Sequence, residues 1–401
     1  MRTTWTFNTA GQIVFGRDSV RQLGDIAGQI GAFRAMIITD GILADAGLVE
    51  RVSAPLLESG VQVEVFTGGR PDPPVHSVED AVEIARDFQP QLLIGLGGGS
   101  NMDLTKAAAT LLTHGGSCQD YAGDQLVPGP VHPLVLIPTT AGTGSEVTAA
   151  SVLNDTDAGR KFALLSNYLR PRVALVDPLL MLSCPPSVTA DSGIDALTHA
   201  IEAYTAIDYE QFPAPPEENT IYQGRHPLGD SLAEQAIGLV GQYLRRVVED
   251  GSDVDAREGM ALAALTAGMS FSNVGVALVH ATEYALAPVA HTSHGRGCGM
   301  LLPHVMRYNA AARPAQMARI ATLLGEEVAG LSDAEAADRA IAAVLQLNAN
   351  IGIPARLSDV GVEASDVAGI AETTFGVKRI LRVNPQEVTV EGITSMLESA
   401  M

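Results

Sequence analysis

The chain has 401 residues, of which 46% are hydrophobic and 4% are aromatic, and its 25 basic and 46 acidic residues give a net charge of −21. This length exceeds the roughly 250–300 residues at which a single hydrophobic core usually stops growing, so two domains are expected. The acidic balance argues against nucleic acid or an anionic membrane as a partner, and no apolar run reaches the ~18–20 residues of a membrane span.

The N-terminal residues and the spacing of the cysteines give an expectation for the cellular compartment. Residues 1–8 contain no apolar signal core. Cys118, Cys184 and Cys298 lie far apart and form no Cys-x-x-Cys pair. The simplest interpretation is a cytoplasmic chain with reduced thiols.

The first half of the chain alternates strand and helix patterns. Helical patterns follow the first predicted strand through Leu57 and span 78–88. Strands that alternate with helices predict an α/β domain with a doubly wound, Rossmann-like parallel sheet, whose ligand crevice lies at the carboxyl ends of the strands. Short apolar runs typical of strands occur at 35–40, 91–95, 135–137 and 173–176, and apolar and polar residues alternate in a further strand candidate at 61–66.

A glycine-rich loop follows the run at 91–95. Gly97, Gly98, Gly99 and Ser100 would let backbone N–H groups approach a phosphate at a helix start, and Ser100 with Asp103 fits a capping box. The loop lacks the Gly-x-Gly-x-x-Gly fingerprint. It therefore fits either a phosphate-binding loop or a tight turn without a ligand.

Two further positions could belong to the same ligand site. Asp40 ends an earlier strand, where it could accept hydrogen bonds from a ribose diol and repel a 2′-phosphate, or simply cap a helix. The loop 138–148 is rich in threonine and glycine and follows another strand. It could form a second wall for phosphate and nicotinamide, or an ordinary turn.

The character of the sequence changes near Pro185. Strand patterns become sparse, and long helical patterns dominate from there to the C-terminus. We expect an α/β domain at 1–184 and an all-helical domain at 185–401. The helical patterns lie at 233–248, 256–270, 317–325, 334–348 and 390–400.

The first predicted helix of the second half carries half of a possible metal site. Asp195 and His199 are four residues apart, so their side chains project from one helix face. A carboxylate oxygen and an imidazole nitrogen suit a divalent ion. His280 and His294, fourteen residues apart, could supply the remaining ligands, although any single histidine also fits a core or surface position.

Taken together, these features resemble the iron-containing (group III) alcohol dehydrogenase family over nearly the whole chain. The resemblance implies an N-terminal dinucleotide-binding domain, a C-terminal all-helical domain and a site in the cleft between them. The motifs that carry it are Gly97-Gly-Gly-Ser-x-x-Asp103, Pro138-Thr-Thr-Ala-Gly-Thr-Gly-Ser-Glu146, Asp195-Ala-Leu-Thr-His199-Ala-Ile-Glu-Ala-Tyr204, and His294-Gly followed by Leu302-Pro-His-Val-Met-Arg-Tyr-Asn309.

The resemblance also implies roles for single residues. It places the metal ligands at Asp195, His199, His280 and His294. On the cofactor side, Asp40 corresponds to the acid that discriminates between NAD and NADP. Lys161 corresponds to a lysine near the cofactor. Its pyrophosphate loop and nicotinamide-side threonines fall on Gly97, Gly98, Gly99, Ser100, Thr139 and Thr140, with Asp103 closing the first motif.

Two features depart from many family members. Tyr284 stands where a second histidine often follows the third ligand, and the segment 209–230 is extended. Both are similar to the hydroxyacid–oxoacid transhydrogenase branch. Tyr284 could orient a polar substrate or pack as a core tyrosine.

The predicted enzyme is a metal-dependent oxidoreductase that transfers hydride between NAD, less favourably NADP, and a small alcohol, aldehyde or hydroxyacid. Fe(II), Zn(II) or another divalent ion would act as a Lewis acid on the substrate oxygen. We expect a homodimer. The alternatives are a transhydrogenase that retains NAD and a lyase of the dehydroquinate synthase type, which shares the fold but against which the Asp-x-x-x-His pair argues.

Overall fold

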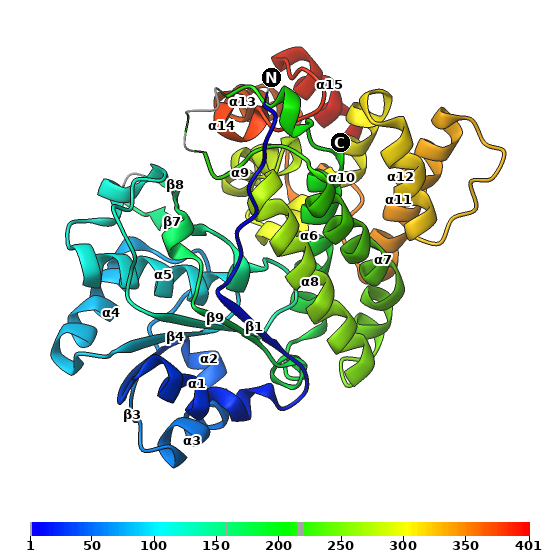
Figure 1. Ribbon diagram of the computed structural model, residues 1–401. Helices are drawn as coiled ribbons and strands as arrows, with labels where there is room; N and C mark the ends of the chain where they lie inside the picture. Colours follow the sequence, from blue (N-terminus) through cyan, green and yellow to red (C-terminus); the bar gives the residue numbers. More distant parts are fainter. Residues whose placement is uncertain (1, 158, 215–217, 219) are drawn as a thin grey trace.

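The structure, a computed structural model, describes residues 2–157, 159–214, 218 and 220–401. A parallel sheet and a helical region lie side by side in it (Figure 1). The six strands of the sheet run in the order β1-β9-β6-β4-β2-β3, and every pair is parallel. They are β1 (Gln12–Phe15), β2 (Arg34–Ile38), β3 (Gln62–Phe66), β4 (Leu92–Gly97), β6 (Leu134–Pro138) and β9 (Val173–Val176).

Both faces of the sheet are buried along the inner strands β2, β4, β6 and β9, as their continuous apolar runs predict, whereas the edge strands β1 and β3 are partly exposed. In β2, Ala35 and Ile37 join the core on one face, whereas Met36 and Ile38 join the core on the other. The strand order reverses between β2 and β4, so the ends of these two strands form the switch point at which ligands bind such sheets. The helices of this half are α1 (Leu23–Ile30), α2 (Gly41–Asp45), α3 (Leu48–Glu58), α4 (Val75–Phe88) and α5 (Gly99–His114).

The first half differs from the sequence prediction in several respects. Neither strand β1 nor helix α1 was among the predicted elements. The single helix expected through Leu57 is two helices, because Gly47 adopts a left-handed conformation with φ of +77° between them. A small second sheet was not predicted; its strands β7 and β8 are antiparallel and β5 pairs with β8. Its strands are β5 (Gly123–Asp124), β7 (Ala150–Asp155) and β8 (Arg160–Leu165).

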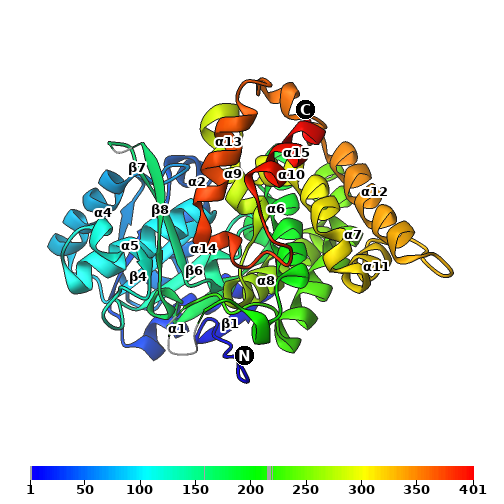
Figure 2. The same cartoon turned by 90° about the horizontal axis from the view of Figure 1, so that it is seen from above.

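Every element described from Pro186 onward is a helix, which confirms the helical second half. Figure 2 shows these helices packed beside the sheet rather than over it. The division at 184/185 stays a prediction, although β9 ends at Val176 and α6 begins at Pro186. The α-helices are α6 (Pro186–Thr205), α7 (Pro227–Glu249), α8 (Val254–Val274), α9 (Leu278–Ala290), α10 (His294–Asn309), α11 (Pro314–Leu323), α12 (Asp333–Ile351), α13 (Val367–Gly376), α14 (Lys378–Leu381) and α15 (Val390–Ala400).

The segment before β1 joins the two regions. It runs along the helical region before it enters the sheet (Figure 1). The backbone N–H of Asn8 donates to Asn273 Oδ1 at 2.8 Å, and the Trp5 ring stacks on His226 with centroids 4.3 Å apart. Residues at the start of the chain therefore pack on helices more than 200 positions later.

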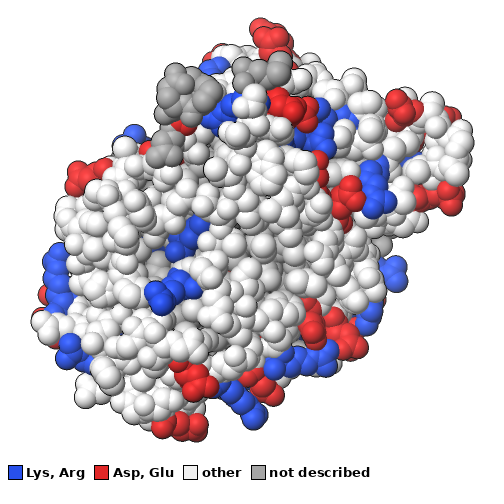
Figure 3. Space-filling model, viewed as in Figure 1, with Lys and Arg blue, Asp and Glu red and all other residues white. Residues whose placement is uncertain are grey.

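The helices and the surface bear on possible partners. Among the described residues no single helix is long and apolar enough to span a membrane; α8 and α9 meet both requirements only together, and they are bent by 102° relative to each other. On the face drawn in Figure 3, Lys and Arg form only small groups among uncharged residues, and acidic side chains lie mostly near the rim. This face lacks the broad basic surface typical of nucleic-acid binding.

Candidate metal centre and cofactor cleft

One cavity brings together the start of α5 and the predicted metal ligands. Gly99, Ser100 and Asp103 line one side, and Asp195, His199, His280, Tyr284 and His294 line the other. The remaining lining residues are Asp72, Pro73, Thr143, Ser145, Thr148, Ala150, Val152, Lys161, Tyr222, Phe271 and Val276.

Three helices position the predicted metal ligands. Asp195 and His199 lie one turn apart on α6, while His280 lies in the first turn of α9 and His294 begins α10. The Asp195 Oδ1 atom lies 3.8 Å from His280 Nε2 and 3.7 Å from His294 Nε2. These distances exceed a hydrogen bond but approach the roughly 3–3.5 Å that separates two ligands bound about 2.1 Å from a common ion.

Two buried glutamates orient the histidines. Glu202 Oε2 lies 2.5 Å from His280 Nδ1, and Glu283 Oε2 lies 2.6 Å from His294 Nδ1. With Nδ1 engaged in this way, Nε2 of each ring is directed toward Asp195. A carboxylate behind the imidazole is the usual arrangement around a metal-binding histidine, because it fixes the ring and raises its basicity.

Three of the possible ligand atoms at the centre have no hydrogen-bond partner in the described part of the chain. Asp195 Oδ1, His280 Nε2 and His199 Nδ1 are buried and make no hydrogen bond within the described residues. Burial raises the pKa of the Asp195 carboxyl, and the neighbouring His294 and His280 only partly oppose this. Unpartnered buried groups of this kind are costly, and a divalent cation would satisfy them, so the residues present fit a metal ion.

His199 occupies a different position in this cluster. Its Nδ1 lies 3.8 Å from Asp195 Oδ2, and its ring is stacked between Phe271 and His280 with centroid distances of 4.0 and 4.6 Å. Burial, helped by His280 and His294, holds the pKa of His199 well below its usual range. The neutral imidazole is the form that binds metal.

On the sheet side, α5 starts directly after β4 at the switch point. Gly97 has φ of +144°, and a Cβ on Gly99 would lie 2.8 Å from Thr143 Cγ2, so both positions require glycine. The predicted Ser100–Asp103 capping box is wrong: the N-cap of α5 is Gly98, without a side-chain bond. Asp103 instead accepts from Ser145 Oγ at 2.6 Å and from the Val152 N–H at 2.9 Å, which holds the second loop against α5.

The remaining predicted cofactor residues are already engaged. Asp40 caps α2 through the Leu43 N–H and accepts from Asn101 Nδ2 at 2.6 Å, while Lys161 Nζ lies 2.7 Å from Asp72 Oδ1. Thr139 donates its N–H to Gly97 O. Lys161 lines the cavity, whereas Asp40, Gly97, Gly98, Thr139 and Thr140 lie outside its wall.

Tyr284 lies one turn beyond His280 and lines the cavity, as the helical pattern predicts. Its ring centroid lies 6.3 Å from that of His294. Burial raises the pKa of Tyr284 to about 12. The phenol therefore keeps its proton at neutral pH and can donate a hydrogen bond into the cavity.

Several residues of the site were missed from the sequence. Glu202 lies seven residues after Asp195 on α6, and Glu283 lies three after His280 on α9, so each shares a helix face with a predicted ligand. That spacing was the available signal. Thr143 and Ser145, rather than Thr139 and Thr140, form the cavity wall in the second loop, which no periodic pattern indicates.

Comparison with known proteins agrees with this geometry. The family described as iron-containing alcohol dehydrogenase matches residues 10–178, and the C-terminal region of the Fe-containing alcohol dehydrogenase family matches residues 218–401. The chain is 38% identical over 388 residues to NAD-dependent methanol dehydrogenase of Bacillus methanolicus, covering 97% of each. It is 39% identical over 360 residues to 1,3-propanediol dehydrogenase of Klebsiella pneumoniae, covering 89% of each.

A solved structure extends the similarity to three dimensions. The crystal structure of a 1,3-propanediol oxidoreductase superposes with a TM-score of 0.93 at 36% identity, covering 99% of this chain and 100% of that one. Both halves of the chain are included in this match. The chain belongs to the iron-containing alcohol dehydrogenase family and is an oxidoreductase.

Proposed function

We propose that the protein transfers hydride between NAD and a small alcohol, aldehyde or hydroxyacid, with a divalent ion held by Asp195, His199, His280 and His294. The observation that supports this most is the shared cavity, because the start of α5 and the ligand cluster face one space. Relatives that are named as NAD-dependent methanol and 1,3-propanediol dehydrogenases support the substrate class.

The chain's own residues would bind and orient the reactants. The first N–H groups of α5 have no partner inside the helix, so they can bind the cofactor phosphates. Phe271 and Val276 give the cavity apolar surface that limits water, and Tyr284 would donate to a polar substrate. When bound, the ion would supply Lewis-acid stabilisation of the substrate oxygen, and nicotinamide would supply the hydride chemistry.

The decisive experiment is an activity panel on protein of measured metal content. Primary alcohols, 2-hydroxyacids and 4-hydroxyacids would be tested as hydride donors with and without added NAD, and aldehydes would be tested as hydride acceptors with NADH. We expect steady NADH formation only with added NAD, loss of activity on chelation, and recovery with Fe(II) or Zn(II). Hydride transfer from hydroxyacid to oxoacid without added NAD would favour the transhydrogenase alternative instead.

The ligand assignment has its own test. His199→Ala and His280→Ala should each lower the metal content of the purified protein. His132→Ala is the matched control, because that ring bonds the Pro90 carbonyl, away from the cavity. Full metal content in both His199→Ala and His280→Ala would contradict the assignment.

A further inference from the structure

Cys298 lies beside the predicted ligands, although it belongs to none of the family motifs found in the sequence. It follows His294 by one turn of α10, and its Sγ lies 3.8 Å from His294 Nε2. One possible ligand atom from each of Asp195, His280, His294 and Cys298 lies within 4.8 Å of all the others. His294 and Cys298 thus repeat on α10 the one-turn spacing of Asp195 and His199 on α6.

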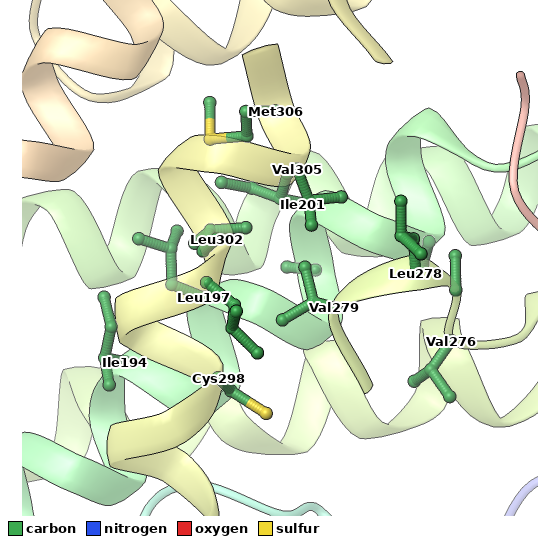
Figure 4. Close-up of a cluster of buried hydrophobic side chains, with 14 of the residues drawn as sticks. Ile194, Leu197, Ile201, Val276, Leu278, Val279, Cys298, Leu302, Val305 and Met306 are labelled. Atoms are coloured by element: carbon green, nitrogen blue, oxygen red, sulfur yellow. The ribbon is translucent and has the colours of Figure 1, made fainter. Parts of the chain in front are cut away.

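A buried thiol can also serve simply as a small apolar side chain. Figure 4 shows Cys298 at one end of an apolar cluster formed by α6, α9 and α10, with Leu302 and Met306 further along α10. That position accounts for its burial but not for its distance to the donor atoms. Leu302, one turn later, points into the same apolar cluster, whereas Cys298 also contacts the polar ring of His294.

The atoms opposite Cys298 provide a second, independent observation. Asp195 Oδ1 and His280 Nε2 have no hydrogen-bond partner, and their residues are only 2% and 3% exposed. Both residues belong to the group that includes Cys298. The thiol therefore lies at a point where two unpartnered buried atoms already indicate a cation.

We propose that Cys298 is a sulfur ligand of the metal centre, an inference that rests on the proposed metal site. On binding, the S–H bond is replaced by a sulfur–metal bond and the proton passes to solvent, with no change in oxidation state. A thiolate favours thiophilic ions such as Zn(II) and Co(II) over Mn(II). With this thiolate, the centre would prefer softer metal ions than a centre formed by an aspartate and three histidines alone.

Cobalt provides a direct test, because a thiolate bound to Co(II) gives a charge-transfer absorption in the near ultraviolet that nitrogen and oxygen ligands do not give. Metal-free full-length protein would be titrated with CoCl2 and its absorption recorded. We expect one Co(II) per chain with this absorption in the wild type. Cys298→Ser and Cys298→Ala should still bind Co(II) but lose the absorption.

Cys184→Ser is the matched control, because that thiol is not part of the group formed with Asp195, His280 and His294, and it should retain the absorption. Competition between Zn(II) and Mn(II) is a second readout: the preference for Zn(II) should fall roughly tenfold or more in Cys298→Ser. Co(II) binding without the absorption in the wild type, or an unchanged absorption in both Cys298 variants, would overturn the sulfur ligand alone. Absence of Co(II) binding to the wild type would overturn the metal centre as well.

Discussion

The two sides of the cavity differ in how their polar side chains are satisfied. On the helical side, Asp195 Oδ1, His280 Nε2 and His199 Nδ1 are buried without partners. On the sheet side, Asp103 accepts from Ser145 Oγ and from the Val152 N–H. Asp40, outside the cavity wall, accepts from the Leu43 N–H of α2 and from Asn101 Nδ2 of α5. The helical side thus presents buried donor atoms that a bound cation would satisfy. The sheet side instead uses its carboxylates as a helix cap and as loop contacts, and the first backbone N–H groups of α5 have no partner inside the helix.

This difference predicts where substitutions cost most. Removing a helical-side ligand leaves other buried donors without a cation, so the effect should be large. Removing a sheet-side carboxylate disturbs a cap or a loop contact, so the effect should be smaller. Each prediction below tests or refines this contrast.

The largest effect is expected for Asp195→Asn, which keeps the shape of the side chain but removes its charge. Metal content should fall to near zero, and kcat/KM should drop by about a thousandfold or more, since Lewis-acid stabilisation contributes several kcal/mol. Elemental analysis and NADH formation measure both quantities. Asp338→Asn, at an exposed position, is the control. Retention of metal with normal activity would show that Asp195 is no ligand.

A second prediction concerns Glu146, a buried carboxyl in the sheet-side loop. Burial raises its pKa from 4.5 to about 7, against the opposing effect of Lys106. The folded state therefore binds more protons than the unfolded state between about pH 4.5 and 7. This contribution to stability is complete below pH 4.5 and is lost as the pH rises through about 7.

Glu146→Gln should remove that loss. Relative to pH 4.5, the metal-free variant should gain about 3 kcal/mol over the wild type by pH 8, at 1.36 kcal/mol per pKa unit. Urea unfolding across this pH range measures the difference, with the exposed Glu249→Gln as the control. Parallel pH profiles for wild type and Glu146→Gln would show that Glu146 is ionised normally.

Glu202→Gln should have the next largest effect, because glutamine keeps the size of the side chain but weakens its bond to His280 Nδ1. Loss of such a partner typically lowers metal affinity by about 10–100-fold, and we expect a value in that range. Competition with a chelator measures it. Glu283→Gln should lower metal affinity to a similar extent, because it weakens the bond to His294 Nδ1. Unchanged affinity in both variants would mean that these glutamates serve packing alone.

The contrast also explains what the sequence could predict. Helix-face spacing identified Asp195 with His199, and continuous apolar runs located the strands, because both patterns are local. The convergence of α6, α9 and α10 is set by tertiary packing, so Cys298 and the glutamates were not found. The hairpin of β7 and β8 was missed because its strands carry polar residues and are only partly buried, so they form no continuous apolar run.

The cofactor preference should depend on Asp40 by roughly a factor of ten, or about 1.4 kcal/mol. NAD should be preferred, because the carboxylate would repel a 2′-phosphate. Asp40→Asn is the sharper variant, since asparagine caps α2 as well as aspartate does, whereas Asp40→Ala also removes the cap. Equal kcat/KM for NAD and NADP in the wild type, or no change in either variant, would contradict the assignment.

The smallest effect is expected for Tyr284→Phe, at the junction of the two sides. The phenol lines the cavity and keeps its proton at neutral pH, so its role would be donation to a polar substrate group. Loss of one hydrogen bond to the substrate should cost about 1 kcal/mol, roughly a fivefold drop in kcat/KM. A hydroxyacid should show this loss, whereas a simple aliphatic alcohol should lose much less. Metal content and fold should be unchanged, and Tyr168→Phe, on an exposed loop, is the control. An equal loss for both substrates would instead assign Tyr284 to packing against the ligand cluster, and no loss for either would remove it from the substrate side altogether.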